Sequence, residues 1–258
     1  MNAAQRRRKI VEIVLERGEI TIAEICEIFN VSEMTARRDL NDLDRQGLLR
    51  RIHGGAIASF GRSYEPPFQI RATKRRAAKA AIGRKAAELV RDGESIALDV
   101  GTTTLEIVRG LREKHNLTIV TSCLQIANLV ANTLSLGTSA RLIVTGGIVR
   151  PRELSMIGPI PEQVYRDYHV DKAFIGVGGI SLEEGFTEYN VEDTQVKKAL
   201  IRSAQEKIVV ADGSKFGVTT FAAIAPLTAV DKIITDRTAP PDMVEEIRKL
   251  GIEVLIAD

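Results

Sequence analysis

From about residue 80 to its end, the 258-residue chain alternates short apolar runs with amphipathic stretches of helical period. The apolar runs place Val and Ile at consecutive positions, which is typical of strands buried on both faces. We expect strands at residues 95–100, 117–121, 141–145, 172–177, 207–211, 232–235 and 252–256. We expect helices between them, at residues 104–114, 123–132, 190–203 and 241–250. This order predicts an α/β domain with a mostly parallel sheet that helices cover on both faces.

The first 57 residues have a different pattern, with three short helices close together. Apolar residues recur at helical spacing from Gln5 to Arg17, and Thr21 with Glu24 forms a capping box that opens a second helix. Ser32 is a good N-cap for a third helix, and Gly47 is a good stop about four turns later. Because only about two residues separate the second and third helices, the segment predicts a helix-turn-helix.

The third helix carries an apolar face and a separate cationic face. Ala36, Leu40 and Leu43 share one side, and Thr35, Arg37 and Arg38 project from the remainder. In a winged helix-turn-helix the second helix of the motif enters the major groove, and the hairpin expected after residue 48 follows the phosphates. The residues expected to contact DNA are therefore Thr21, Ser32, Thr35, Arg37, Arg38, Arg50, Arg51 and His53. The alternative is a packed helical bundle with a solvated charged surface.

The charge is divided unevenly along the chain. Residues 1–85 hold 18 Lys and Arg against 10 Asp and Glu, whereas residues 86–258 hold 18 against 24. This asymmetry indicates a polyanion partner for the first part only. Cys26, expected to be buried, and Cys123 are too few for a disulfide framework, and with three scattered histidines they predict no metal site. We expect no cofactor, no membrane contact and a cytoplasmic location, since neither a signal peptide nor a membrane span is visible.

Residues 58–78 are expected to link a DNA-binding domain at 1–57 to a second domain at 79–258, because Gly61, Pro66 and Pro67 interrupt any regular element. A basic cluster at residues 71–76 ends this linker. Three interpretations stay open for the cluster: a solvated face, an extension that contacts phosphates, or a transmitter of conformational change between the domains.

Small and polar residues follow several of the expected strands. In a parallel sheet the carboxyl ends of strands meet at one edge, where ligands bind. The segment 99–104 joins a glycine, a helix start and three hydroxyls, which suits a phosphate, although a plain strand-to-helix turn is the alternative. The residues expected to contact this ligand are Asp99, Gly101, Thr102, Thr103, Thr104, Thr121, Ser122, Gly146, Gly147, Gly178 and Asp212, with Arg150 and Lys215 as cations.

The chain resembles the DeoR family of bacterial transcriptional regulators. Residues 35–40 followed by 48–56 resemble its N-terminal signature, although Ala36 stands where that family usually has a β-branched residue. Residues 65–258 look like its effector domain, whose fold is similar to ribose-5-phosphate isomerase. The pieces that match are 101–104, 146–147, 171–176, Asn190 with Glu192, Lys197, and 211–217.

The resemblance implies a repressor of a carbohydrate or polyol operon whose affinity for operator DNA is modulated by a phosphorylated sugar or a related metabolite. It adds Glu192 and Lys197 to the expected ligand site. It also implies a homo-oligomer, a dimer or a tetramer, that pairs the DNA-binding domains on repeated half-sites.

An enzyme is the main rival interpretation. The isomerases carry Asp-Gly-Ala-Asp where this chain reads Gly-Val-Gly-Gly at 176–179, and their catalytic glutamate falls near Lys198. With these carboxylates replaced we expect no catalysis, although Glu188, Glu192 and Asp193 remain nearby. A structural DNA-binding protein without a ligand is a third possibility, and it leaves the polar strand ends unexplained.

Overall fold

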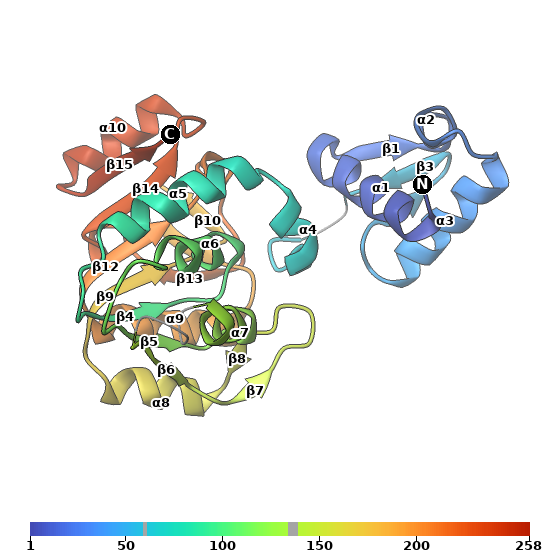
Figure 1. Ribbon diagram of the computed structural model, residues 1–258. Coiled ribbons are helices and arrows are strands. Elements are labelled where there is room, and N and C mark those ends of the chain that lie inside the picture. The colour runs from blue at the N-terminus through green and yellow to red at the C-terminus, as the bar shows by residue number, and fades with distance from the viewer. Residues whose placement is uncertain (59–60, 134–138) are drawn as a thin grey trace. The chain divides into compact units, whose positions relative to one another are not determined.

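The computed structural model describes residues 1–58, 61–133 and 139–258, which form two compact units. Unit 1 is Met1–Pro66 and unit 2 is Pro67–Asp258 (Figure 1). The boundary falls inside the linker expected at 58–78, of which residues 59 and 60 lie outside the described part. Among the described residues, no helix combines the length and the apolar character needed to cross a membrane.

Unit 1 contains the three helices and the hairpin that the sequence predicts. Its elements are α1 Ala3–Arg17, β1 Glu19–Thr21, α2 Ile22–Phe29, α3 Glu33–Arg45, β2 Arg50–Ile52 and β3 Gly55–Ile57. The capping box is present, since the Thr21 N–H donates to Glu24 Oε2 (2.7 Å) and the Glu24 N–H donates to Thr21 Oγ1 (3.2 Å). The Ser32 hydroxyl accepts from the Thr35 N–H at 3.3 Å, which caps α3. Helix α3 ends at Arg45, slightly before the glycine expected to stop it.

A short strand that the sequence does not predict completes the sheet of unit 1. Strand β1 pairs antiparallel with β3, in the order β1-β3-β2, and Ile20 lies opposite Ala56. Three residues hold too little alternation to be recognised as a strand. The core beneath this sheet consists of buried side chains of all three helices: Ile10, Val11, Val14, Ile25, Ala36, Leu40 and Leu43. Each of the Ile, Val and Leu side chains contributes about 1.5–3 kcal/mol to stability when fully buried.

The linker prediction is wrong for residues 68–78. Helix α4, Phe68–Thr73, and the start of α5, Arg76–Glu88, lie within it, and both helices belong to unit 2. Phe68 and Ile70 are buried, so this segment is anchored by apolar contacts that its prolines and charges conceal in the sequence.

Unit 2 is built on a seven-stranded parallel sheet in the order β15-β14-β12-β9-β4-β5-β6. Every strand expected from the apolar runs is confirmed, with ends shifted by up to three residues. In chain order they are β4 Ser95–Leu98, β5 Thr118–Thr121, β6 Arg141–Val144, β9 Val170–Ile175, β12 Ala204–Val210, β14 Lys232–Asp236 and β15 Glu253–Ala257.

Helices cover both faces of this sheet (Figure 1). Helices α5, α6 (Thr102–Gly110) and α7 (Leu124–Thr133) contribute to one apolar cluster, and α8 (Pro159–Asp167), α9 (Val191–Ser203) and α10 (Pro241–Lys249) to the other. Successive strand residues alternate between the clusters, since Ile96 and Leu98 belong to the first and Ala97 to the second. Helix α6 begins two residues earlier than expected, so it includes the threonine run.

Short antiparallel pieces lie outside the main sheet. They are the pair β7 Ile148–Val149 and β8 Met156–Ile157, and the three strands β10 Gly179–Ser181, β11 Gly185–Glu188 and β13 Ala222–Ala225. Two 3₁₀ turns accompany them, η1 Gly213–Lys215 and η2 Leu227–Ala229. The antiparallel pair and the three-stranded sheet both follow strands of the parallel sheet in the chain. Several residues expected at the ligand site therefore lie directly beside them: Gly147 and Arg150 flank β7, and Gly178 precedes β10.

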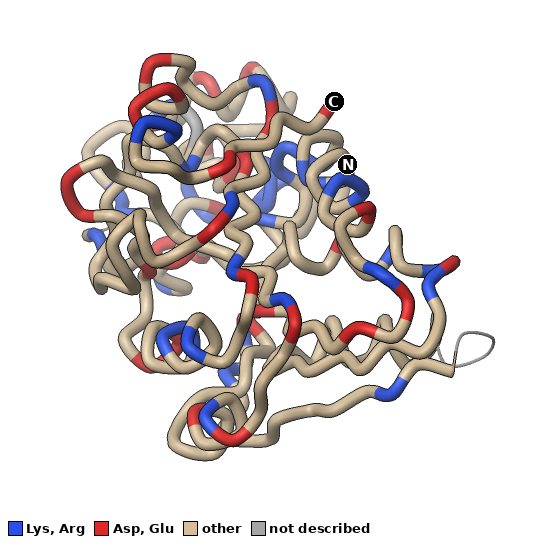
Figure 2. Tube along the Cα trace, turned by 90° about the vertical axis from the view of Figure 1, so that its left-hand side faces the viewer, with Lys and Arg blue, Asp and Glu red and all other residues tan. Residues whose placement is uncertain are grey.

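Basic and acidic residues are interspersed along much of the trace (Figure 2). Many of the exposed ones pair within a single helical turn, as Arg166 does with Glu162 and Lys249 with Glu246. Such pairs contribute only a few tenths of a kcal/mol each, so they keep the surface solvated rather than hold the fold together.

Candidate DNA-binding face and ligand site

One exposed stripe of α3 is the candidate DNA-binding face. Met34, Arg37, Arg38, Asn41 and Arg45 share this side of the helix, opposite its buried apolar face, and with Glu33 they line a shallow, open pocket. At about 100° per residue these positions fall within roughly one third of the helix circumference. Their shared direction explains how one helix both packs into unit 1 and presents cations outward.

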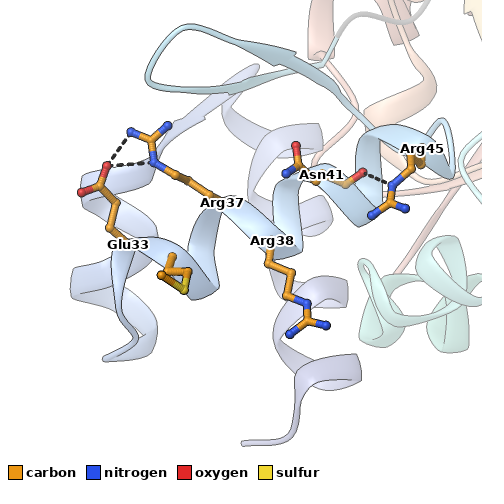
Figure 3. A pocket seen from close by; sticks show the side chains of 6 residues that line it. Glu33, Arg37, Arg38, Asn41 and Arg45 are labelled. Atoms are coloured by element: carbon orange, nitrogen blue, oxygen red, sulfur yellow. Dashed lines mark hydrogen bonds and ion pairs between the residues drawn. The ribbon is translucent and has the colours of Figure 1, made fainter.

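The two arginines predicted on this face have different surroundings. The Arg37 Nε donates to Glu33 Oε1 at 2.9 Å, one turn earlier on the helix. Arg38 makes no hydrogen bond or ion pair with any described residue and extends away from the Glu33–Arg37 pair (Figure 3). Of these two arginines, Arg38 is therefore the more available for a phosphate or a base edge.

Asp39 is a structural residue of this helix that the sequence analysis missed. Its carboxylate is 2% exposed and accepts from Arg6 Nε (2.6 Å) and Arg7 Nε (2.7 Å), so it joins α3 to the start of α1. Its place between Ala36 and Leu40 on the packed face was the available signal. An acidic residue on a buried apolar face needs a cationic partner, and Arg6 and Arg7 of α1 are its partners in the structure.

Only two of the three hairpin residues expected to contact DNA are exposed on β2–β3. Arg50 and His53 are exposed, whereas Arg51 is half-buried and its Nη1 donates to Asn41 Oδ1 at 2.5 Å. The Arg51 N–H also donates to Asp44 Oδ1 at 3.1 Å. The structure therefore places Arg51 against α3, where it fixes the hairpin on the helix.

The three hydroxyl residues expected to contact DNA, Thr21, Ser32 and Thr35, make hydrogen bonds at the N-termini of α2 and α3. Thr21 Oγ1 donates to Glu24 Oε2 at 2.8 Å, and Ser32 Oγ lies 3.0 Å from Thr35 Oγ1. These contacts fix the starts of α2 and α3. Cys26, expected to be buried, is half-buried on α2.

In unit 2, a buried ionic cluster lies where β4 and β9 end. Lys197 Nζ pairs with Asp99 Oδ2, donates to the Gly176 carbonyl (2.8 Å) and lies 3.4 Å from Glu188 Oε2. Burial alone lowers the pKa of Lys197, but the two carboxylates outweigh that effect, so its pKa is raised and the ammonium stays charged. Asp99 and Lys197, both expected at the ligand site, are thus brought together and satisfy each other.

The threonine run forms the first turn of α6. Gly101 is the N-cap, and residues 102–104 are buried in the turn, whose N–H groups have no partner within the helix. The Thr104 hydroxyl donates to the Gly101 carbonyl at 3.0 Å, which ties the loop to the helix. Partial positive charge gathers at such a turn, so an anion seat here stays a prediction.

The residues that follow β5 and β6 mainly shape the same edge. Thr121 Oγ1 donates to the Leu98 carbonyl (2.7 Å), and the Ser122 carbonyl accepts from the Met156 N–H (2.7 Å). Gly147 has φ +119°, and a Cβ there would meet Ile157 O at 2.8 Å, so only glycine fits after Gly146. These residues are placed at the predicted edge, with their hydrogen-bonding groups largely used within the protein.

Glu192, expected at the ligand site, lies in the first turn of α9. Its side chain is exposed, and its Oε2 accepts from Asn190 Nδ2 at 3.3 Å. Asp193, the next residue, is buried and pairs with Arg150. The two neighbours differ in burial because a step of one residue along a helix turns the side chain by about 100°.

A group of cations surrounds the end of β12. Asp212 Oδ1 accepts from the Ser214 N–H (3.0 Å) and lies 3.7 Å from Arg75 Nε, while Lys215 Nζ lies 5.6 Å from the centre of the Tyr189 ring. Lys79, which the sequence analysis missed, is 6% exposed. Burial is the main cause that lowers the pKa of Lys79 to about 8, with Asp212 and Lys215 among the charges that act on it.

The basic cluster at 71–76 is turned partly into unit 2. Arg75 Nη1 donates to Thr238 Oγ1 at 3.0 Å, and Arg71 pairs with the buried Glu153. Arg71 is half-buried and Arg75 is exposed, and both contact residues of unit 2.

Gly178 lies where β10 approaches β11 closely. A Cβ at Gly178 would meet Glu188 Oε1 and Thr220 Oγ1, each at 3.0 Å. The Thr220 hydroxyl is buried and has no hydrogen-bond partner among the described residues. In the part of the chain that the structure describes, no group of three or more His, Cys, Asp and Glu side chains is placed to hold a metal ion.

Together these features define a class of protein: a winged helix-turn-helix regulator with a separate α/β sensor-type unit. Two family models match the chain, a DeoR-like helix-turn-helix domain over residues 6–59 and a DeoR C terminal sensor domain over residues 74–237. The chain belongs to the DeoR family of transcriptional regulators.

Curated relatives match over nearly the whole chain. The glycerol-3-phosphate regulon repressor of Escherichia coli K12 is 33% identical over 254 residues, covering 98% of this chain and 99% of that protein. The transcriptional repressor AccR of Agrobacterium fabrum is 34% identical over 248 residues, covering 95% of each. These relatives are named as regulators, and the chain is accordingly a regulator and not an enzyme. Among solved structures, ribose 5-phosphate isomerase A of Methanocaldococcus jannaschii covers 55% of each chain at 21% identity and a TM-score of 0.41.

Proposed function

We propose that this regulator binds operator DNA in the cytoplasm through α3 and the β2–β3 hairpin, as a sequence-specific repressor of a carbohydrate or polyol operon. The observation that carries the proposal is the exposed stripe of α3, in which Arg38 has no partner among the described residues while the opposite face is fully packed. An unpaired guanidinium on the outer face of a recognition helix suits bidentate contact with guanine. Arg50 and His53, exposed on the hairpin, suit phosphates.

The ligand half of the proposal is a phosphorylated sugar or a related metabolite. Arg75, Lys79 and Lys215 gather near Asp212, and the N-terminal turn of α6 supplies N–H groups and hydroxyls. Cations and a helix start together favour a phosphate. Glu188 and the partnerless Thr220 hydroxyl near Gly178 favour hydroxyl groups at the other end of the ligand.

The ligand changes DNA affinity by acting on the turn at 150–154. Arg150 at one end of this turn pairs with Asp193, and Glu153 at the other pairs with Arg71 and accepts from the Phe68 N–H (3.1 Å). Helix α4, which carries Phe68 and Arg71, begins two residues after the end of unit 1. A ligand that displaces Asp193 from Arg150 shifts the turn and hence the segment leading to the DNA-binding unit. The active form is a homo-oligomer, a dimer or a tetramer, that engages repeated half-sites.

The test begins with selection of a duplex from a random library by the wild-type protein. In a fluorescence anisotropy titration of that duplex, Arg38→Ala is expected to weaken binding by roughly 5- to 150-fold, the range for one bidentate base contact. Arg166→Ala, on the exposed surface of unit 2, is the matched control and should bind as the wild type does. Equal affinities for Arg38→Ala and wild type would contradict the assignment of α3.

The ligand half is tested by thermal shift. Sugar phosphates are expected to raise the melting temperature where the corresponding free sugars do not, and the phosphate that does so should change the affinity for the selected duplex. If free sugars stabilise the protein equally, the phosphate seat is wrong.

A further inference from the structure

Met34 is the most exposed large hydrophobic side chain among the described residues, with 81% of its surface accessible. It is the second residue of α3 and belongs to the same stripe as Arg38 and Asn41. The opposite face of the helix already holds the apolar residues that the core needs. Fold stability therefore does not explain Met34, and its position in a cationic pocket indicates a partner that is both anionic and locally apolar.

We propose that Met34 contacts the 5-methyl group of a thymine in the major groove and thereby determines specificity at one base pair. This inference rests on the proposed DNA-binding function of α3. The N-terminal residues of a recognition helix reach base edges, and thymine is the one base that presents a methyl group in that groove. Methionine suits the contact because its unbranched thioether adapts to an irregular apolar surface.

The neighbouring charges are compatible with this docking. Glu33 would repel the phosphate backbone if it stood alone, but it pairs with Arg37, which neutralises it. Arg38 lies one helical turn after Met34 on the same side of the helix. Four residues rise about 6 Å along a helix, and base pairs are spaced about 3.4 Å apart. The thymine contacted by Met34 should therefore lie about two base pairs from a guanine read by Arg38.

The probe is the duplex selected from a random library by the wild-type protein, with each thymine replaced in turn by deoxyuridine. This replacement removes one methyl group and leaves every hydrogen-bonding atom in place. Wild type should lose about fourfold in affinity at one thymine, the factor expected for one buried methyl group. Met34→Ala should bind the unmodified duplex more weakly by a similar or larger factor and should not distinguish thymine from deoxyuridine at that position.

The matched control is Ile28→Ala, which removes another exposed apolar side chain from unit 1, on α2. It should keep the full deoxyuridine penalty, and circular dichroism melts should show both variants folded. The proposal is overturned if Met34→Ala still binds the deoxyuridine duplex more weakly than the thymine duplex, or if no deoxyuridine replacement weakens binding of the wild type. It is also overturned if the sensitive thymine lies far from every guanine whose recognition is lost in Arg38→Ala. In each of these cases a weakened Arg38→Ala would leave the proposed function standing. If no duplex is selected at all, both fail.

Discussion

At the residue scale, the cationic end of the proposed ligand site includes a lysine that is costly to bury. Lys79 is buried and its Nζ donates to the Arg71 carbonyl, in a setting shared with Asp212 and Lys215. Such a group destabilises the empty protein while it is charged. A bound phosphate would offset that cost, so the same residue favours the liganded state.

The depressed pKa of Lys79 predicts a dependence of stability on pH. Its pKa is about 8 in the folded protein against an ordinary value of 10.5, because burial disfavours the charged form. Between these values the unfolded chain binds more protons, so this group makes the free energy of unfolding rise with pH, by about 3 kcal/mol in total. The gain is absent below pH 8 and complete above 10.5.

Lys79→Met isolates this contribution. In urea denaturation at several pH values, the variant should be more stable than wild type at pH 7, and the difference should shrink as the pH rises from 8 to 10.5. Lys85→Met, at an exposed end of the same helix, is the control and should run parallel to wild type. Parallel curves for Lys79→Met as well would show that Lys79 is not a buried cation.

At the element scale, the buried Asp39 carboxylate joins α3 to α1. Asp39 accepts hydrogen bonds from Arg6 and Arg7, so the recognition helix depends on the first turns of α1 as well as on apolar packing. A buried hydrogen bond to a charged group contributes more than a neutral one. The position of the DNA-binding face therefore follows from residues far from it in the sequence.

Asp39→Asn should lower the stability of unit 1 by about 1–3 kcal/mol, because it removes the buried negative charge that Arg6 and Arg7 share. Hydrogen exchange measures the effect element by element, and amides of α1 and α3 should exchange faster while those of β9 and β12 do not change. Asp42→Asn removes a more exposed partner of Arg7 and should have a smaller effect. Uniform acceleration in both units would show that Asp39 acts on the whole fold.

Elements with long periodic patterns could be predicted, and those fixed by tertiary contacts could not. The seven parallel strands and the three helices of unit 1 carry continuous apolar signals. Helix α4 was not predicted, because the prolines before it and its basic residues are typical of a linker. It is held in place by the burial of Phe68 and by the hydrogen bond of the Phe68 N–H to Glu153, which is distant in the sequence. For the site, the sequence located the polar sheet edge, but the pairing of Asp99 with Lys197 joins residues 98 positions apart.

At the scale of the whole molecule, the proposed coupling of ligand and DNA binding passes through the turn at 150–154. Glu153 is 2% exposed and contacts both Phe68 and Arg71, and Arg150 in the same turn contacts the start of α9. A regulator responds to a ligand only if the ligand binds one arrangement better than another. The ion pair between Glu153 and Arg71 holds α4 in the arrangement that the structure shows, and a ligand that favours another arrangement would have to break this pair.

Glu153→Gln keeps the shape of this side chain and removes its charge, so it should loosen α4 without emptying the ligand site. The variant is expected to bind the selected duplex, and to be stabilised by the sugar phosphate found by thermal shift, yet its DNA affinity should respond to that phosphate at least fivefold less than wild type does. Glu94→Gln breaks the ion pair with Lys172 at the opposite, amino ends of the strands and should keep the full response. An unchanged response in Glu153→Gln would move the coupling away from α4, because its main ionic attachment would then be dispensable for regulation.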